Sequence, residues 1–503
     1  MTSVGCKQSK MTLLDMTIER VIEQVDTSFE DVVAVEDASD DEEAASGMGT
    51  PTEDPIFLIT IEDNPTYSKQ RSSSMPSTPL QRLLSLLLLL LPSSLREHLS
   101  SRYVGVDQFH PIFLVPGVSC SDLEARLTEA YRPSVPHCGA MKGKGWFGLW
   151  KNNSELLAHD YVQCFQEQMS LVYDPAVNDY RNLPGVETRV PNFGSTRAFS
   201  HKNPVKPEWC LGKLRVALEK LGYRDGDTMF GAPYDIRYAP PVPGQTSEVY
   251  SRYFKEFMAL IEIASKKKQK KVVIFGHSFG GMVAFEFVRN TPLAWRQRYI
   301  KHLVLVAPTL SNGFMEPVKN FAAGTDILFV PTTTPLSTRS MWRSFESAIV
   351  NFPSPALFGH KPLVITKQRN YSAYDMEHFL TAVGFSEGIE PFRKRAIPKM
   401  MNFKAPMVPM TYINGVGNKT PLQLVFWEND FDASPEAVYG DGDGKINLNS
   451  VLAFDKEMCQ QPGQKNQFKS IKIDKAQHST IVTDDFALQR VIQEIIEVNK
   501  VSS

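Results

Sequence analysis

The chain has 503 residues, 42% of them apolar and 22% charged, which is the composition of a globular protein with at least one large core. Its formal net charge of −2 provides no positive field for a polyanion, so nucleic acid is not expected as a partner. Its six cysteines are too few for a disulfide scaffold and form no C-x-x-C pair, so neither a structural metal nor a cofactor site is indicated.

Residues 1–80 combine an acidic stretch with a Ser/Pro-rich one and are expected to be disordered, because they bury too little apolar surface to offset the entropy of ordering. Residues 81–105 hold a leucine run that is too short to span a bilayer. Together with Met75 upstream, this run has the layout of a secretory signal peptide. Translation from Met75 would send the product to the secretory pathway or the extracellular space. Otherwise the leucines form a short helix, and we expect a cytoplasmic or peripherally membrane-associated protein.

Residues 106–500 show the pattern of a parallel sheet wrapped by helices, because short apolar runs alternate with helical stretches. The expected buried strands are residues 112–115, 271–275, 303–306 and 422–427, and the expected helices are residues 207–221, 248–264, 282–290 and 485–499. Two insertions interrupt the alternation, at residues 133–197 and 313–401. Insertions at strand ends are where an α/β sheet carries its cap or lid, and we place the lid at about residues 133–170.

The segment from Gly276 to Gly280 reads Gly-His-Ser-Phe-Gly and lies between an apolar strand and a helix. A strand that turns directly into a helix strains the central serine and leaves no room for side chains two positions to either side. Ser278 is therefore predicted to stand exposed at the helix N-terminus as a nucleophile. G-x-S-x-G also recurs by chance in long chains, but the flanking strand and helix favour the nucleophile.

A serine of this kind needs a base, and the base needs a carboxylate that holds its tautomer. In α/β-hydrolases the chain order is Ser, then Asp or Glu, then His. The Gly/Asp-rich segment 439–444 follows an apolar strand and contains Asp441 and Asp443, both of which satisfy this order. Calcium binding is the alternative for such a segment, but the EF-hand pattern fails because its downstream glutamate is missing.

The expected base is His478, which lies after both aspartates and just before the last helix. His277 adjoins the serine but is expected to point away from it on the turn. Three other histidines lie downstream of the serine but precede the Gly/Asp-rich segment, against the expected order: His302, His360 and His378.

From about Pro111 to about Asn499 the chain resembles the lecithin:cholesterol acyltransferase family, and most closely its plant members. The resemblance is carried by Phe113-Leu-Val-Pro-Gly117 with Leu123-Glu124, Pro184-Gly-Val-Glu-Thr-Arg-Val-Pro191 with Phe193-Gly194, Gly231-Ala-Pro-Tyr-Asp-Ile-Arg237, the serine motif, and Tyr439-Gly-Asp-Gly-Asp-Gly444. It implies an α/β-hydrolase domain with a cap and a membrane-facing lid, a Ser-Asp-His triad, and phospholipase A or acyltransferase activity.

Position by position, the resemblance puts the triad at Ser278, Asp443 and His478, with Asp443 preferred over Asp441. It puts the oxyanion hole at the backbone N–H groups of Val118 and Phe279.

The resemblance also implies that a disulfide between Cys138 and Cys164 closes the lid loop around Trp146 and Trp150. Exposed tryptophans on such a loop suit insertion at a lipid interface, and the alternative is that both rings are ordinary core aromatics.

Three departures from the family pattern lie near the site, and a fourth concerns a disulfide. Cys120 stands where a glycine is expected, Thr309 where a tryptophan is expected, and Lys445 where a threonine is expected. Cys459 lacks the partner cysteine that the family would have near Ile413, so that second disulfide is expected to be absent.

The expected function is transfer of a fatty acyl group from a glycerophospholipid to an alcohol such as a sterol, at a peripheral membrane or other lipid interface. The alternative is a phospholipase A or lipase that uses water as the acceptor, because both reactions pass through the same acyl-serine. A non-catalytic α/β-hydrolase protein that binds lipid is the third possibility.

Overall fold

The computed structural model describes residues 8–9, 109–118, 120–150, 161–199, 210–310, 313–325, 334–428 and 430–500. These residues all belong to one compact unit, formed by Met1–Lys10 and Val106–Ser503. The expected signal-like segment lies outside the described residues, as does the expected disordered extension apart from residues 8–9. Within the described ranges, no helix is both long and apolar enough to cross a lipid bilayer.

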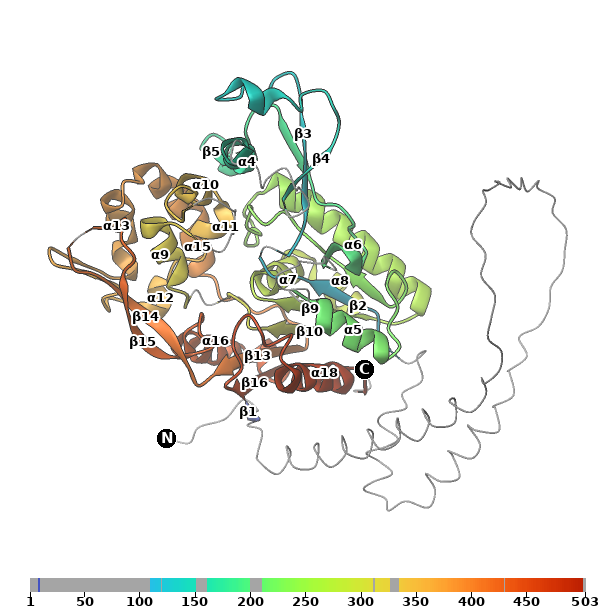
Figure 1. The fold of residues 1–503 in the computed structure, drawn as a ribbon. Coiled ribbons are helices and arrows are strands. Elements are labelled where there is room, and N and C mark those ends of the chain that lie inside the picture. Colours follow the sequence, from blue (N-terminus) through green and yellow to red (C-terminus); the bar gives the residue numbers. More distant parts are fainter. Residues whose placement is uncertain are drawn as a thin grey trace, which may run out of the picture. The chain divides into compact units, whose positions relative to one another are not determined.

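A seven-stranded sheet forms the core of this unit, with the strand order β1-β16-β13-β10-β9-β2-β8 (Figure 1). All neighbouring strands in it are parallel. The strands are β1 (Gln8–Ser9), β2 (Ile112–Val115), β8 (Met229–Gly231), β9 (Val272–His277), β10 (Ile300–Val306), β13 (Met410–Val416) and β16 (Phe468–Asp474). Every residue of β9 is buried, as expected of an apolar strand at the centre of a sheet that is covered on both faces.

The described residues place seven helices around this sheet. They are α5 (Gly212–Lys220), α6 (Glu248–Lys268), α7 (Phe279–Asn290), α8 (Leu293–Tyr299), α16 (Leu448–Gln460), α17 (Pro462–Lys465) and α18 (Asp485–Lys500). Four of them, α5, α6, α7 and α18, overlap the helices predicted from the sequence. Helix α6 begins after Ser247, whose side chain accepts a hydrogen bond from the Tyr250 N–H at 3.4 Å. It ends at Gln269, which adopts a left-handed conformation.

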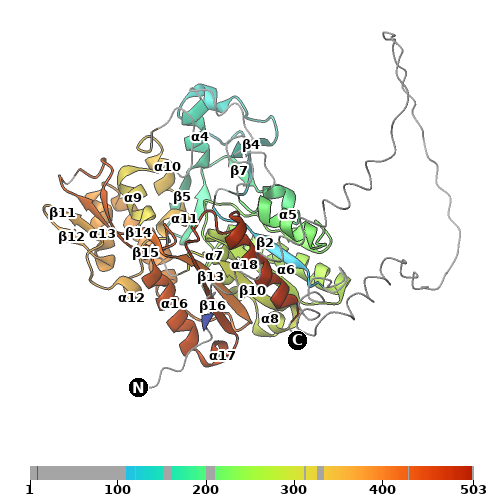
Figure 2. The same cartoon turned by 60° about the horizontal axis from the view of Figure 1, so that its bottom comes forward.

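Different helices cover the two faces of the sheet. Ile274 of β9 belongs to one apolar cluster with the buried faces of α6 and α7, where Phe257 and Phe287 stack with ring centroids 4.3 Å apart. Helices α5 and α18 lie side by side (Figure 2), and Lys213 and Asp485 join them through an ion pair at 2.7 Å.

The first insertion forms the region expected to be the lid and, with the strand that precedes it, a small antiparallel sheet. Its sheet has the order β4-β3-β7, with β3 (Leu123–Leu127), β4 (Phe147–Trp150) and β7 (Val186–Arg189). The lid region contains the short helix η2 (Pro136–Gly139), the helix α4 (Val162–Met169) and the hairpin of β5 (Leu171–Asp174) and β6 (Asp179–Asn182). The short helix η5 (Thr196–Phe199) follows the small sheet.

The second insertion is a mainly helical cap. Its helices are α9 (Glu316–Ala323), α10 (Arg339–Arg343), α11 (Glu346–Ile349), α12 (Pro355–Phe358), η6 (Ala373–Asp375), α13 (Met376–Ala382), η7 (Ser386–Gly388), α14 (Ile389–Pro391), η8 (Phe392–Ala396) and α15 (Ile397–Met400). A mixed sheet of order β12-β11-β14-β15 accompanies them, with β11 (Val364–Thr366), β12 (Asn370–Tyr371), β14 (Asn418–Phe426) and β15 (Glu436–Gly442).

The architecture is the α/β-hydrolase fold with a cap and a lid insertion. One expected strand has a different place from the one predicted. Residues 422–427 fall largely in β14, which belongs to the mixed sheet of the cap, whereas β13 and β16 complete the central sheet. The apolar end of β14 is buried in the main apolar cluster, where Leu424 and Phe426 join buried side chains of the cap, so its hydrophobicity resembles that of a central strand.

Candidate active site

The turn between β9 and α7 holds Ser278 in a strained backbone conformation, with a φ of 54°. A Cβ on Gly280 would lie 2.1 Å from the Pro116 carbonyl oxygen, and one on Gly276 would lie 2.7 Å from the Gly280 carbonyl oxygen. Both glycines are therefore required by close backbone approach. Ser278 is only 8% exposed, which corrects the prediction of an exposed serine.

Three side chains from distant parts of the sequence form a hydrogen-bonded series. Ser278 Oγ lies 2.9 Å from His478 Nε2, and His478 Nδ1 lies 2.9 Å from Asp443 Oδ2. An ionised carboxylate can only accept a hydrogen bond, so Nδ1 carries the imidazole proton and Nε2 is free to accept the serine proton. All three residues are buried.

Backbone contacts fix both the carboxylate and the imidazole of this series. Asp443 Oδ1 accepts hydrogen bonds from the N–H groups of Lys445 at 2.9 Å and Ile446 at 2.7 Å. The His478 N–H donates to the Asp443 carbonyl oxygen at 2.8 Å. The loops after β15 and β16 are thus joined directly at the site.

The structure brings only one of the two aspartates to the histidine. Asp441 is exposed, and its Oδ1 accepts a hydrogen bond from the Gly417 N–H at 2.6 Å, which closes the turn between β13 and β14. Of the two residues that satisfied the expected chain order, Asp443 is therefore the one placed to orient His478.

His277 bonds to the backbone of the His478 loop. Its Nε2 lies 3.1 Å from the His478 carbonyl oxygen, so Nε2 carries the proton. Burial, followed by the neighbouring His478, lowers the pKa of His277 to about 4 and keeps the ring neutral. The other candidate histidines contact groups elsewhere. His302 forms a hydrogen bond with Thr411, His360 stacks on the Tyr374 ring, and His378 lies beside the Asp375 carboxylate.

The two residues expected to form the oxyanion hole flank Ser278. Phe279 is the first residue of α7, where backbone N–H groups lack intrahelical acceptors. Val118 follows Gly117 in the loop after β2, and a Cβ on Gly117 would lie 3.3 Å from the Ser278 Cβ. The backbone that carries the Val118 N–H therefore passes in contact with the nucleophile.

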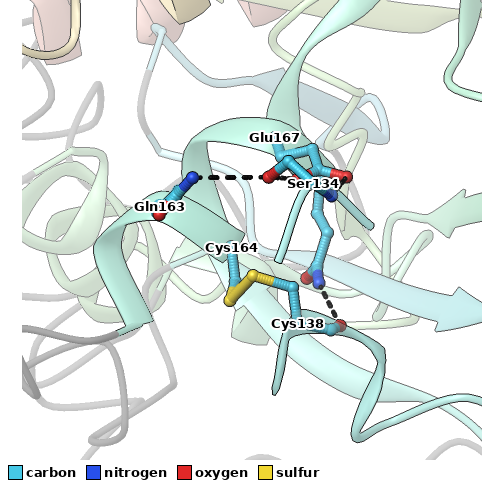
Figure 3. The surroundings of a disulfide bond; sticks show 6 residues. Ser134, Cys138, Gln163, Cys164 and Glu167 are labelled. Carbon is cyan, nitrogen blue, oxygen red and sulfur yellow. Dashed lines mark hydrogen bonds between the residues drawn. A yellow bond between two sulfur atoms is a disulfide. The ribbon is translucent and has the colours of Figure 1, made fainter. Parts of the chain in front are cut away.

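Cys138 and Cys164 form the disulfide that the resemblance implied, and it joins η2 to α4 at the base of the lid (Figure 3). A second link lies beside it, because the Ser134 N–H donates to the Glu167 carboxylate at 3.0 Å. Residues 151–160, which belong to the loop that this disulfide closes, lie outside the described residues.

The described tryptophans of the lid contact protein groups. Trp150 is 7% exposed and stacks on Phe165 with ring centroids 5.9 Å apart. The prediction that it inserts into lipid is therefore wrong, and the core interpretation holds for this ring. Trp146 is half-buried, with the guanidinium groups of Arg126 and Arg189 at 5.1 and 4.4 Å from its ring centroid.

Cys120 and Cys210 form a disulfide that sequence reasoning missed. Ninety residues separate the two positions, and no local pattern connects them. Cys459 is also disulfide-bonded, so the lack of a cysteine near Ile413 does not leave it as a thiol.

Within the described residues, the one cluster with metal-ligand chemistry is His137 with Cys138 and Cys164. Both of its sulfurs are already bonded to each other, so it offers only one side chain to an ion.

Two further departures from the family pattern contact the frame of the site. The Thr309 N–H donates to the Ser278 carbonyl oxygen at 3.3 Å, and Thr309 is buried. The ammonium group of Lys445 forms an ion pair with Glu316 of the cap helix α9. Neither contact replaces a hydrogen bond of the Ser278–His478–Asp443 series.

Comparisons with known proteins agree with the geometry. Residues 146–389 match the family model described as lecithin:cholesterol acyltransferase. The chain is 42% identical over 393 residues to lecithin-cholesterol acyltransferase-like 1 of Oryza sativa subsp. japonica, covering 78% of this chain and 87% of that protein. It is 32% identical to the lysosomal phospholipase A and acyltransferase of Rattus norvegicus (72% and 86% covered), and 27% identical to the phosphatidylcholine-sterol acyltransferase of Mus musculus (83% and 94% covered).

Proposed function

Because the chain belongs to the lecithin:cholesterol acyltransferase family, we propose that Ser278, His478 and Asp443 move a fatty acyl group from a glycerophospholipid to an alcohol acceptor. The family consists of lipid acyltransferases and phospholipases that work through a serine, and this chain is an enzyme of that kind. The roles of these three residues are proposed from the hydrogen-bonded series that runs from Ser278 Oγ through His478 to Asp443, in which both distances are 2.9 Å.

The proposed reaction has two halves. In the first, His478 Nε2 takes the Ser278 proton, Oγ attacks the ester carbonyl, and the tetrahedral oxyanion is held by the N–H groups of Val118 and Phe279. His478 then gives the proton to the departing lysolipid oxygen, which leaves an acyl-serine. In the second half, His478 takes the proton of the acceptor hydroxyl, that oxygen attacks the acyl-serine, and Ser278 recovers its proton.

A second candidate is hydrolysis, in which water replaces the alcohol in the second half. The name of the rat relative includes both activities, and both use the same acyl-serine. Supplying phospholipid with a radiolabelled acyl chain, with and without sterol, and separating free fatty acid from sterol ester decides between them. We expect sterol ester to form when sterol is present. Release of fatty acid alone, at a rate that sterol does not change, would assign the protein as a phospholipase.

The Ser278→Ala variant provides the control for this assay. It should lose at least about 10³-fold in turnover while still folding, because the change removes only the nucleophile. Wild-type protein should also be labelled by a fluorophosphonate probe at Ser278. An unlabelled but folded wild-type protein would instead support the non-catalytic lipid-binding interpretation.

We also propose that the lid loop controls the access of lipid substrates to Ser278. The Cys138–Cys164 disulfide and the Ser134–Glu167 hydrogen bond tie the base of the lid loop to α4 (Figure 3). Replacing both cysteines by serine should lower activity on phospholipid vesicles far more than activity on a short soluble ester, because the central sheet is built elsewhere. Equal losses on both substrates would argue against a lid role.

A further inference from the structure

The Cys120–Cys210 disulfide lies beside the loop that is proposed to stabilise the oxyanion. Cys120 comes two residues after Val118 and is 3% exposed, and Cys210 directly precedes the first turn of α5. The two Cα atoms are 5.7 Å apart. The disulfide therefore fastens the loop after β2 to the start of α5, through a cysteine ninety residues later in the chain.

This loop has little freedom on the side that faces the nucleophile. A Cβ on Gly117 would lie 3.3 Å from the Ser278 Cβ, and a Cβ on Gly280 would lie 2.1 Å from the Pro116 carbonyl oxygen. The loop backbone and the serine turn are thus in direct contact. Any shift of the loop therefore changes the distance between the Val118 N–H and the oxyanion of the intermediate that forms on Ser278 Oγ.

Non-covalent contacts hold the loop at two points. The Tyr234 hydroxyl donates to the Pro116 carbonyl oxygen at 3.0 Å, and the Tyr234 N–H donates to Ser121 Oγ at 3.2 Å. Between these points, the Cys120 N–H donates to the Gly117 carbonyl oxygen at 3.3 Å. The segment that contains Val118 therefore lies between two fixed ends, and the disulfide adds a covalent restraint at the second of them.

The other end of the disulfide is well anchored. Leu211 and Leu214, on either side of the start of α5, are fully buried. Lys213 pairs with Asp485 of α18 at 2.7 Å. Cys210 thus directly precedes a helix start whose leucines are packed in the core, so the crosslink joins the loop to a packed element.

We propose that the Cys120–Cys210 disulfide positions the Val118 N–H for the oxyanion of the tetrahedral intermediate. The family pattern has a glycine at position 120, where conformational freedom is largest. This chain replaces that freedom with a crosslink, so the two cysteines are positioning residues for the reaction. The inference rests on the proposed function, since it assumes that Ser278 forms an acyl-enzyme.

The test replaces both cysteines by serine, so that no unpaired thiol remains. With a short soluble ester, kcat should fall about tenfold while KM changes less than about twofold, because a displaced donor weakens binding of the oxyanion but not of the ground-state ester. The expected loss is smaller than the loss of about 10²–10³-fold that typically follows complete removal of one oxyanion donor. A trifluoromethyl ketone, which forms a tetrahedral adduct with the serine, should bind about tenfold more weakly. A non-hydrolysable ether analogue of the ester should bind equally well to both proteins.

Active sites are counted by fluorophosphonate labelling, so that misfolded protein does not enter kcat. Should the double variant fail to fold, wild-type enzyme and a variant in which the other four cysteines (Cys6, Cys138, Cys164 and Cys459) are serine are treated with a phosphine reductant, which converts each disulfide to two thiols. The loss of kcat on the soluble ester should appear in both.

An unchanged kcat, or equal weakening of the ketone and the ether, would overturn the proposal. Absence of labelling at Ser278 in the wild type would instead overturn the proposed function.

Discussion

At the scale of single residues, the two aspartates of the 439–444 segment give a sharp test. Asp443 Oδ2 bonds His478 Nδ1 at 2.9 Å, whereas Asp441 Oδ1 caps a turn through Gly417. Asp443→Asn should lower kcat by about 10⁴-fold, because an amide that donates to Nδ1 stabilises the wrong tautomer. Asp441→Asn is the matched control and should cost less than about tenfold. The reverse ranking in steady-state assays on a soluble ester would show that the wrong aspartate was assigned.

His277 provides a prediction about pH. Burial, followed by the electrostatic effect of the neighbouring His478 ring, lowers the pKa of His277 from 6.5 to about 4 in the folded protein. Between these values the unfolded chain binds a proton that the folded chain does not, so the free energy of unfolding rises with pH in this window. The stability present above pH 6.5 is thus lost as the pH falls toward 4, with a slope of at most about 1.4 kcal/mol per pH unit for this residue.

Urea unfolding between pH 7 and pH 4 measures this dependence. The His277→Gln variant should show a shallower slope, because Gln does not titrate but can still donate to the His478 carbonyl oxygen. Parallel curves for the two proteins would mean that His277 does not stay neutral in the folded state.

Much of the site could be predicted at this scale, because its chemistry requires local patterns. A strand-turn-helix junction demands glycines around Ser278, and the chain order of the fold class limits the choice of acid and base. The choice of Asp443 over Asp441 came from the family resemblance, since both residues satisfy the order. The Cys120–Cys210 pair left no local signal, because a disulfide depends on the distance between Cα atoms and not on sequence spacing.

At the scale of elements, Trp150 belongs to the packing between β4 and α4. It is 7% exposed and stacks on Phe165 in the main apolar cluster. Trp150→Ala should therefore destabilise the protein by about 3–5 kcal/mol, through lost burial and the cavity left behind. Trp146→Ala should cost about 1 kcal/mol, since that ring is half-buried and contacts the exposed guanidinium groups of Arg126 and Arg189.

Thermal or urea unfolding of both variants measures the difference. Activity of Trp150→Ala should fall on soluble esters and on vesicles alike, in proportion to the folded fraction. A normally stable Trp150→Ala protein that fails only on vesicles would restore the lipid-anchor interpretation.

The central strands and helices could be predicted because each buries a regular set of positions, which leaves a recognisable pattern in the sequence. Strands covered on both faces read as apolar runs, and helices such as α6 and α18 read as amphipathic repeats. The residues 422–427 misled the prediction because an apolar strand in the cap has the same composition as one in the core. Lid and cap elements are short and irregular, and their positions depend on tertiary contacts that no periodicity records.

At the scale of the whole molecule, one buried arginine joins the cap, the lid region and the core. Arg395 of η8 has no exposed surface, and its guanidinium binds Glu346 of α11 at 2.6 Å and the Thr246 carbonyl oxygen, just before α6, at 2.6 Å. It also donates to the Asn178 carbonyl oxygen beside β6 at 3.0 Å. Glu346 in turn accepts a hydrogen bond from the Ala239 N–H of the core at 2.9 Å.

Removing one member of this group should therefore loosen both insertions together. Arg395→Met should destabilise the protein by about 3–5 kcal/mol, because it leaves the Glu346 carboxylate buried without its partner. Burial already raises the pKa of Glu346, so loss of the arginine should raise it further, and lower pH should recover part of the lost stability by protonating the carboxylate.

The double variant Arg395→Met/Glu346→Gln separates the charge from the packing. It should be more stable than Arg395→Met alone, because the amide carries no charge and can still bond the Ala239 N–H. Urea unfolding of the two single variants and the double variant gives the coupling energy. If the double variant were no more stable than Arg395→Met, the ion pair would not be what holds the insertions to the sheet, and the apolar contacts of η8 would carry the junction instead.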